Sequence, residues 1–578
     1  MSNAAIRARR SALATPRRLL AIVASSTLAV TMSTTPVASE QASQKQAFQE
    51  QASPKRKPGD SNPAERTPDK QQPPAERARA EQPSDKQQPP AEHAPAEQPS
   101  AELANAEATG EPRPVPLTRP EMKQRLEEIK QRTPRLPLPD ITEAERAALA
   151  ERGVTYENRL RYHYLPPLPA ALAGSWRWSG SGFAGGSRDA DPDMRLDYAF
   201  KTRLFWIVSR TNNCQYCLGH QESKLLAAGM SEDQIAALDS EWSLFPAREQ
   251  AAFAYSRKLT YTPHWLSDAD FAALAPHFTP LEILEMTLSI AGNNAINRWK
   301  EGAGVPQSSD GGNFGRTGPN PANSPRVTEH HSYLTPTSSK YAAQLSRVAP
   351  IANDPRTGTP TTRALFRREP PETRAVVEEA LRAAMTRKSR LPLADESAAR
   401  GVLPPEWKGD VALLPGQPTG QRSAPPSELV SGPLPGWIRL LASFPRSAPS
   451  RILAVRMLES EGDLPAALKA KTAWIVARQD RAWYAAGEAR AALCRQGLTD
   501  DAIFSLDDNA TPVERSLFRV ARKLAASPVV LTDADVADAV KLAGPRIVTQ
   551  FIQYVTHRAS FQRVTEAAHL PLEASWAK

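Results

Sequence analysis

The sequence has little cysteine and few aromatic residues, and it lacks a compact basic region. Its 3 cysteines among 578 residues are too few for a disulfide scaffold. The net charge of +9 is spread along the chain, without a run of Lys and Arg interleaved with aromatic side chains in the helical blocks. Nucleic acid is therefore not an expected partner, and solvated helix faces explain the charge better.

The first 39 residues show the order of features of an export signal. Five arginines between positions 7 and 18 precede an apolar stretch at 19–32, and Val37-Ala38-Ser39 offers small residues for cleavage. The apolar stretch is shorter than a membrane-spanning helix requires, so a permanent anchor is not expected. We expect residues 1–39 to be a signal peptide and the protein to be exported to the periplasm or the cell envelope.

Residues 40–115 are rich in Pro, Glu and Gln, and the segment 69–76 recurs there as 85–92. Such a segment cannot bury enough apolar surface to offset the entropy of ordering it, so we predict a disordered spacer. Beyond it, apolar residues recur at helical spacing and strand patterns are sparse, which predicts an all-α fold. A loop-like stretch at 307–365 is expected to link two helical domains, 116–306 and 366–578.

The two helical domains repeat one another in sequence. The matched stretches are 206–210 with 474–478, 266–270 with 531–535, and 135–138 with 390–393. The offset is 268 positions in the first pair and 265 in the second, so a short deletion separates the copies. We therefore predict a duplicated helical domain. Arg298 recurs as Arg563, and we expect both to have a structural role as members of ion pairs.

Cys214 and Cys217 form a CxxC motif within the sequence NCQYCLGH at 213–220. We expect an asparagine just before Cys214 to cap a helix that stops at Gly229, which leaves Cys214 in the first turn. There the helix dipole and the free N–H groups stabilise a thiolate. Cys217 and His220 follow at intervals of three on the same face. This spacing predicts a redox-active dithiol in which His220 exchanges a proton with Cys217.

Other uses of a CxxC motif fit the sequence less well. A c-type haem site needs a histidine directly after the second cysteine, where Leu218 stands. A structural zinc site needs four ligands, usually as two pairs, whereas this motif offers one pair and His220. A thioredoxin-like site follows a strand, but these surroundings are helical. Zinc and a purely structural disulfide stay open as alternatives to redox chemistry.

The second copy serves as an internal control for the motif. At the offset of 268, the two thiols correspond to Ala482 and Ala485, and the histidine corresponds to Glu488. The scaffold therefore persists without the thiols, which argues against a structural role for them. We infer that the first copy holds the reactive site and that the second copy has a structural role. The third cysteine, Cys494, matches Leu226 and is expected to be a small buried apolar residue.

Four motifs of the first copy are CQYCLGH at 214–220, AAGMSE at 227–232, LSDAD at 266–270 and NRW at 297–299. With these motifs, residues 195–306 resemble the carboxymuconolactone decarboxylase and alkyl hydroperoxidase D family, and about 460–571 resemble it as a degenerate copy. The dithiol is similar to that of the hydroperoxidase branch, because the decarboxylase branch lacks it.

The resemblance implies an all-helical fold and a thiol reaction. It implies that Cys217 attacks a peroxide or a disulfide, that Cys214 completes an internal disulfide, and that His220 assists proton transfer. It implies neither a metal nor an organic cofactor, and it requires a dithiol reductant as a partner. A homo-oligomeric state stays open.

Two positions depart from the family pattern. The family histidine usually stands four residues after the second cysteine, where this chain has Gln221, one position after His220. The family glutamate lies about a dozen residues before the first cysteine, where this chain has Lys201 and Arg203 instead of an acid. Either residue could lower a thiol pKa by its charge, or could simply be solvated. Glu285, at helical spacing further on, is expected to face solvent.

The sequence therefore predicts a thiol-dependent peroxidase or disulfide oxidoreductase with Cys214, Cys217 and His220 at its site. The alternative is a non-catalytic scaffold or binding protein of the cell envelope with a vestigial site. The missing glutamate, the long spacer and the degenerate second copy favour this alternative.

Overall fold

The computed structural model describes residues 112–150, 153–166, 191–307, 332–350, 371–403 and 432–576, all within the unit Pro95–Lys578. The predicted signal peptide, nearly all of the predicted spacer and most of the predicted linker lie outside these ranges. Within them the secondary structure is helical, apart from one isolated bridge between Thr118 and Leu345. The all-α prediction is therefore confirmed. No helix in the described ranges is long and apolar enough to cross a membrane.

The helices fall into two series along the chain. The first is α3 (Arg119–Glu128), α4 (Glu143–Leu149), α5 (Tyr156–Tyr164), α7 (Tyr198–Thr211), α8 (Gln215–Ala227), α9 (Glu232–Ser240), α10 (Ala247–Tyr261), α11 (Asp268–Leu274) and α12 (Pro280–Ala303). The short α13 (Ser339–Ala342) follows. The second is α14 (Arg374–Ala384), α15 (Glu396–Gly401), α17 (Gly436–Leu441), α18 (Ala448–Ser460), α19 (Ala466–Asp480), α20 (Trp483–Arg495), α21 (Asp500–Phe504), α22 (Pro512–Ala525) and α23 (Asp533–Ala567).

Helix boundaries follow local sequence signals. Thr279 and Glu282 form a capping box at the start of α12, in which each side chain accepts a hydrogen bond from the other residue's main chain. Pro280 occupies the first turn, where its missing N–H costs nothing. The helix ends at Gly304, whose φ of 62° is the left-handed conformation that closes many helices.

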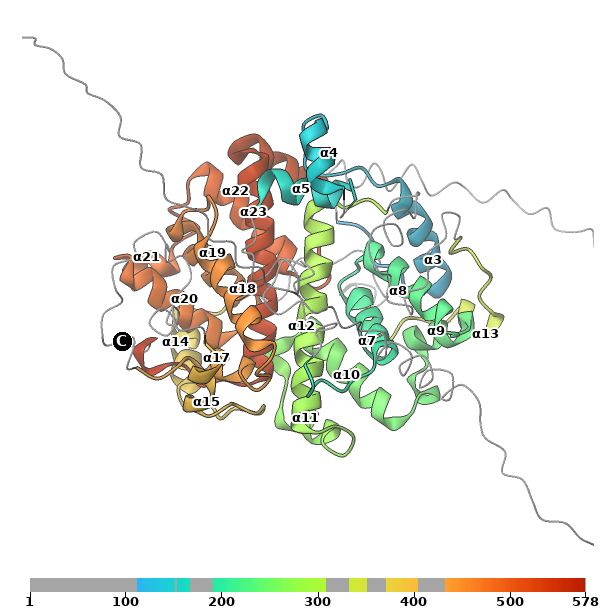
Figure 1. Cartoon of the computed structure of the whole chain (residues 1–578), viewed down its shortest axis with the longest axis horizontal. Helices are drawn as coiled ribbons and strands as arrows, with labels where there is room; N and C mark the ends of the chain where they lie inside the picture. Colours follow the sequence, from blue (N-terminus) through green and yellow to red (C-terminus); the bar gives the residue numbers. More distant parts are fainter. Residues whose placement is uncertain are drawn as a thin grey trace, which may run out of the picture. The chain divides into compact units, whose positions relative to one another are not determined.

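The two longest helices, α12 and α23, pack against each other between the two series (Figure 1). Helices α7, α8 and α10 contact α12, and α19, α20 and α22 contact α23. Gly302 lies where α12 meets α23, and a Cβ atom at this position would stand 2.5 Å from Cγ2 of Ile552. A residue without a side chain is thus required for this close approach of the two helices.

Helix α23 consists of two helices joined end to end. Gly544 inside it has a φ of 80°, which is not helical, and Pro545 follows directly. At the offset of 265, Pro545 corresponds to Pro280, the first residue of α12. The part of α23 before Gly544 therefore corresponds to α11, and the part after it corresponds to α12.

Local backbone geometry also recurs at the offset of 268 found in the sequence. Helix α8 spans Gln215–Ala227 and α20 spans Trp483–Arg495, so both ends shift by the same amount. Asn213 before α8 has a φ of 56°, and Arg481 before α20 has a φ of 52°. Gly229 and Gly497 after these helices have φ values of 89° and 87°. A duplication requires such matches, and the duplication itself stays a prediction.

Two buried arginines, one from each helix series, each donate hydrogen bonds to the other series. Arg298 on α12 donates to the main-chain oxygen of Ala525 at 2.9 Å, and Arg563 on α23 donates to that of Thr260 at 2.9 Å. Both guanidinium groups also reach Oγ of Ser527, at 2.8 and 3.3 Å. Because Arg298 matches Arg563 and Thr260 matches Ala525 at one offset, the contact is reciprocal, as in a two-fold interface.

A second pair of reciprocal arginine contacts involves the stretches 135–138 and 390–393, which repeat in the sequence. Arg135 donates to the main-chain oxygen of Leu531 at 3.1 Å, and Arg390 donates to that of Leu266 at 3.1 Å. Each arginine also pairs with the aspartate two residues further on in the partner series, namely Asp533 and Asp268. The repeated sequence at 135–138 and 390–393 thus coincides with a contact between the two helix series.

Candidate functional site

The turn between α7 and α8 determines the position of the first cysteine. Asn212 ends α7, and Asn213 takes the left-handed conformation with a φ of 56°. The N–H of Cys214 then donates back to the carbonyl of Ser209 at 2.9 Å, and Cys214 is itself the N-cap of α8. The expectation that an asparagine caps α8 with Cys214 in its first turn was wrong, because the left-handed Asn213 places the helix start one residue later. The predicted stop at Gly229 is confirmed.

The two thiols lie against each other. Sγ of Cys214 and Sγ of Cys217 are 2.6 Å apart, and both cysteines are free. The Cys214 sulfur also accepts a hydrogen bond from the main-chain N–H of Cys217 at 3.4 Å. Both side chains are buried, at 0% and 2% exposed, in an apolar cluster with Leu136 and Trp299. The two thiols thus lie in contact at the start of one helix, in buried and largely apolar surroundings.

Three influences raise the pKa of Cys214 above its ordinary value. Burial is the largest, the adjacent Cys217 thiol is the second, and the Glu301 carboxylate is the third. The hydrogen bond from the Cys217 N–H acts in the opposite direction but is weaker. The expected stabilisation of a Cys214 thiolate by the helix start is therefore outweighed.

His220 is buried on α8, and its ring lies edge-on to Tyr216 with the centroids 4.5 Å apart. Burial lowers its pKa well below the usual value, and the nearby charges of Lys224 and Lys300 lower it further. The imidazole is therefore neutral at neutral pH, with one nitrogen able to donate and the other able to accept. The proposed exchange of a proton between His220 and Cys217 stays a prediction.

A partly buried ion cluster borders the dithiol on the side of Tyr216. Nζ of Lys300 lies 4.3 Å from the centroid of the Tyr216 ring and pairs with the Glu157 carboxylate. Nε1 of Trp299 donates to Glu157 at 2.7 Å. Burial would raise the pKa of Glu157, but Lys300 and Arg161 hold it well below its usual range. The cluster holds Tyr216, which lies between the two thiols in sequence and directly before Cys217.

Glu301 on α12 is a residue of this site that the sequence did not reveal. Its Oε2 accepts from Nη2 of Arg132 at 3.1 Å and from Nη1 of Arg113 at 3.5 Å. Burial would raise its pKa, but Arg132, Arg113 and Arg135 together lower it, so the carboxylate is ionised. Glu301 follows the matched NRW motif, yet it lies far from Cys214 in sequence. Only the packing of α8 against α12 brings the two together.

Lys201 and Arg203, which occupy the region of the family glutamate, form ion pairs with other carboxylates. Nζ of Lys201 pairs with Oε1 of Glu285 at 2.5 Å, and Arg203 pairs with Glu249 at 2.8 Å. The suggestion that either one lowers a thiol pKa is therefore not supported. Glu285 is fully buried and also accepts from the main-chain N–H of Leu196 at 3.0 Å. Its expected exposure was wrong, because α12 is covered on both sides.

Two further expectations are resolved by the packing. Arg563 forms a buried ion pair with Asp480 at 2.9 Å, whereas Arg298 uses main-chain oxygens, Ser527 and Oδ1 of Asn294. The expected ion pair is confirmed for Arg563. Cys494 is half-buried at the edge of the apolar core, less buried than expected.

The second series carries a polar cluster at the position of the dithiol site. Glu488, which corresponds to His220, binds Arg558 at 2.7 Å, and Arg558 also binds Glu459 at 2.8 Å. Tyr554 and His557 bind Glu459 at 2.8 and 2.9 Å. Burial raises the pKa of Glu488 to about 7, whereas Arg558 and His557 overcome burial and lower the pKa of Glu459 to about 2.

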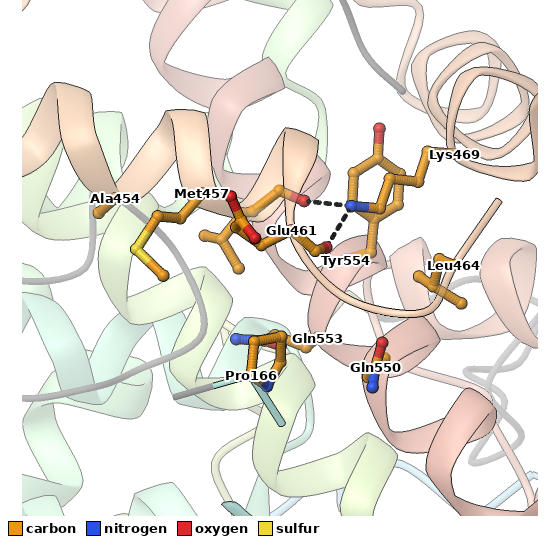
Figure 2. A pocket seen from close by; sticks show the side chains of 10 residues that line it. Pro166, Ala454, Met457, Glu461, Leu464, Lys469, Gln550, Gln553 and Tyr554 are labelled. Atoms are coloured by element: carbon orange, nitrogen blue, oxygen red, sulfur yellow. Dashed lines mark hydrogen bonds between the residues drawn. The ribbon is translucent and has the colours of Figure 1, made fainter. Parts of the chain in front are cut away.

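A pocket of about 460 Å³ lies beside this polar cluster (Figure 2). The amine of Lys469 in its wall donates to the main-chain oxygens of Leu458, Glu459 and Glu461 at 3.2, 3.1 and 2.7 Å. Burial lowers the pKa of Lys469 to about 8. The residues that line the pocket are Pro166, Ala454, Met457, Leu458, Glu461, Leu464, Lys469, Gln550, Gln553 and Tyr554. Lys469 corresponds to Lys201 at the offset of 268, but Lys469 donates to main-chain oxygens at the end of α18, whereas Lys201 pairs with the Glu285 carboxylate.

In the part of the chain that the structure describes, no three His, Cys, Asp or Glu side chains gather so that they could hold a metal ion. Comparison of the chain with protein-family models, with curated proteins and with solved structures finds no match. The resemblance to the hydroperoxidase family therefore depends on the sequence motifs and stays an expectation.

Proposed function

We propose that the chain is a thiol-dependent peroxidase or disulfide oxidoreductase that acts through Cys214 and Cys217. The observation that carries this proposal is the contact of two free thiols, 2.6 Å apart, at the start of α8. A disulfide needs its sulfurs about 2.05 Å apart, so a small rotation of the side chains is enough to form the bond. The apolar surroundings favour a reaction that water does not intercept.

The proposed reaction has three balanced steps. The Cys217 thiolate attacks a peroxide oxygen, the O–O bond breaks, and an alcohol or water leaves with a proton. The sulfenic acid on Cys217 is then attacked by Cys214, so that an S–S bond forms and water leaves. A dithiol reductant finally exchanges with this disulfide and restores both thiols. His220, which follows on the same helix, is proposed to pass protons during these steps.

We further propose that the chain arose by duplication of one helical domain. The reciprocal arginine contacts and the recurrence of α8 as α20 support this origin. The second copy would then supply the partner surface that a second subunit supplies in a two-fold dimer. In this interpretation a single dithiol serves the whole chain.

The alternative proposal, a non-catalytic scaffold of the cell envelope, also has support in one observation. Both sulfurs are buried, and burial raises the pKa of Cys214, whereas reactive cysteines are usually more accessible and ionise more easily. The two proposals differ in whether the reduced protein consumes peroxide.

The test is peroxide consumption by the full chain with dithiothreitol as reductant. We expect the wild type and Cys494→Ser to consume hydrogen peroxide at equal rates, because Cys494 lies outside the site. Cys217→Ser should lose the activity. Equal rates for wild type and Cys217→Ser would refute peroxidase activity at this dithiol.

A further inference from the structure

The pocket of the second helix series lies where the first series has a buried ion pair. In the first series, Nζ of Lys201 pairs with Oε1 of Glu285 at 2.5 Å, and Oε2 of Glu285 accepts from the main-chain N–H of Arg195 at 2.7 Å. Lys201 corresponds to Lys469 at the offset of 268, and Glu285 corresponds to Gln550 at the offset of 265. Both corresponding residues line the pocket (Figure 2).

Gln550 keeps the main-chain contact of Glu285 but not its charge. Oε1 of Gln550 accepts from the main-chain N–H of Asp463 at 2.7 Å, and Asp463 corresponds to Arg195 at the offset of 268. Nε2 of Gln550 donates to the main-chain oxygen of Tyr164 at 2.8 Å. The second series has therefore replaced the carboxylate of the ion pair by a neutral amide, while the lysine persists.

Lys469 contacts neutral oxygens in place of that carboxylate. Its amine donates to the main-chain oxygens of Leu458, Glu459 and Glu461 at 3.2, 3.1 and 2.7 Å, which uses all three donors of an ammonium group. The Glu459 carboxylate binds Arg558 at 2.8 Å. Burial lowers the pKa of Lys469 to about 8, although the charges of Glu459 and Glu461 act to raise it. The wall of the pocket thus holds a buried cation that is incompletely compensated.

Gln553 offers a second polar group to the pocket. It lies one turn after Gln550 on α23, lines the pocket and is 7% exposed. Among the described residues its side-chain amide has no hydrogen-bond partner. Buried amides are usually hydrogen-bonded, so this group is available to a molecule in the pocket.

Half of the residues that line the pocket are apolar, namely Pro166, Ala454, Met457, Leu458 and Leu464. The volume of about 460 Å³ suits a small molecule. Such a wall accommodates a short aliphatic chain, whereas a second charged group there would lose its hydration without a partner. The pocket therefore combines a cation, an available amide and an apolar side.

We propose that this pocket binds a small aliphatic carboxylate, which gives Lys469 the negative charge that Glu285 gives Lys201. The ligand carboxylate takes the place of one of the two longer hydrogen bonds of the amine, because a full negative charge attracts a buried ammonium more strongly than a carbonyl dipole does. Gln553 donates to the ligand carboxylate, and the aliphatic chain packs on the apolar side. Neither cysteine of the CxxC motif lines the pocket, so the proposal does not depend on the dithiol reaction.

The experiment follows the methyl signals of isotope-labelled methionine by NMR in the full-length protein near neutral pH. Sodium butyrate is the probe, and butyramide is the uncharged control of the same shape. We expect butyrate to shift the signal of Met457, which Met457→Leu identifies by its loss. Butyramide should bind about tenfold more weakly or less, because it lacks the charge that Lys469 attracts.

Two substitutions act on the ion pair itself. Lys469→Met removes the cation and should weaken butyrate binding about tenfold or more. Gln550→Glu restores the carboxylate of the first series, which should occupy the amine and weaken butyrate binding as much. Lys471→Met is the matched control, since Lys471 pairs with Glu514 and does not line the pocket. It should leave the affinity for butyrate unchanged.

The wild type alone can overturn the proposal, whatever the variants do to folding. An unshifted Met457 signal would overturn it, as would equal affinities for butyrate and butyramide. Unchanged butyrate affinity in folded Lys469→Met or folded Gln550→Glu would also overturn it, and so would an equal loss in Lys471→Met. None of these measurements involves peroxide or the thiols, so their outcome is independent of the proposed dithiol function.

Discussion

Replacing Glu488 by glutamine removes an ionisable group from the position that holds His220 in the first series. A glutamine has the shape of the protonated carboxyl and keeps an oxygen that accepts from Arg558. Because Glu488 is buried at 3% exposed, its charge is poorly screened by water. The substitution therefore tests the charge of the group with little change in packing.

The magnitude follows from the raised pKa of Glu488, about 7 in the fold against an ordinary value of 4.5. A carboxyl with a raised pKa binds its proton more tightly in the folded state. Its contribution to stability is complete below pH 4.5 and is lost as the pH rises through 7. The loss amounts to about 3 kcal/mol in the free energy of unfolding.

Urea unfolding at several pH values, followed by tryptophan fluorescence, measures this loss. We expect Glu488→Gln and wild type to have similar stability at about pH 4.5, and the variant to be more stable by about 3 kcal/mol at pH 8. Glu459→Gln is the mirror control. Its pKa is lowered to about 2, so the carboxylate stabilises the fold at neutral pH and the variant should be less stable there. A difference between wild type and Glu488→Gln that does not change with pH would refute the reasoning.

Three further substitutions test the packing by thermal or urea unfolding. Arg563→Met leaves Asp480 buried without its ion-pair partner and should cost about 3–5 kcal/mol, whereas Arg374→Met at an exposed pair should change little. Gly302→Ala places a Cβ against Ile552 and should cost about 1–3 kcal/mol, while Gly401→Ala, where a Cβ meets nothing within 4 Å, should not destabilise. Gly229→Ala forces a side chain into a φ of 89° and should cost about 1–2 kcal/mol. Unchanged stability in any of the three would contradict the contact assigned to it.

The sequence was informative about features that depend on neighbours along the chain. Helical spacing predicted the all-α fold, and Thr279 with Glu282 marked the start of α12. Gly229 marked the end of α8, because glycine takes the left-handed conformation without a steric cost. The same signals failed at Asn213. This residue takes the left-handed conformation although it is not glycine, so α8 starts one residue later and Cys214 is its N-cap.

The sequence by itself determined the helices, the paired thiols at 214 and 217, and the repeated stretches that led to the duplication hypothesis. Only the tertiary structure decided what faces these thiols. Glu301 is far from Cys214 in the chain. Glu285 was expected to face solvent, but it is buried because other helices pack on both sides of α12. Burial and the charges brought in by packing set the pKa of a thiol, and these depend on the whole fold. The tertiary structure therefore set the acid–base character of a dithiol that the sequence had located.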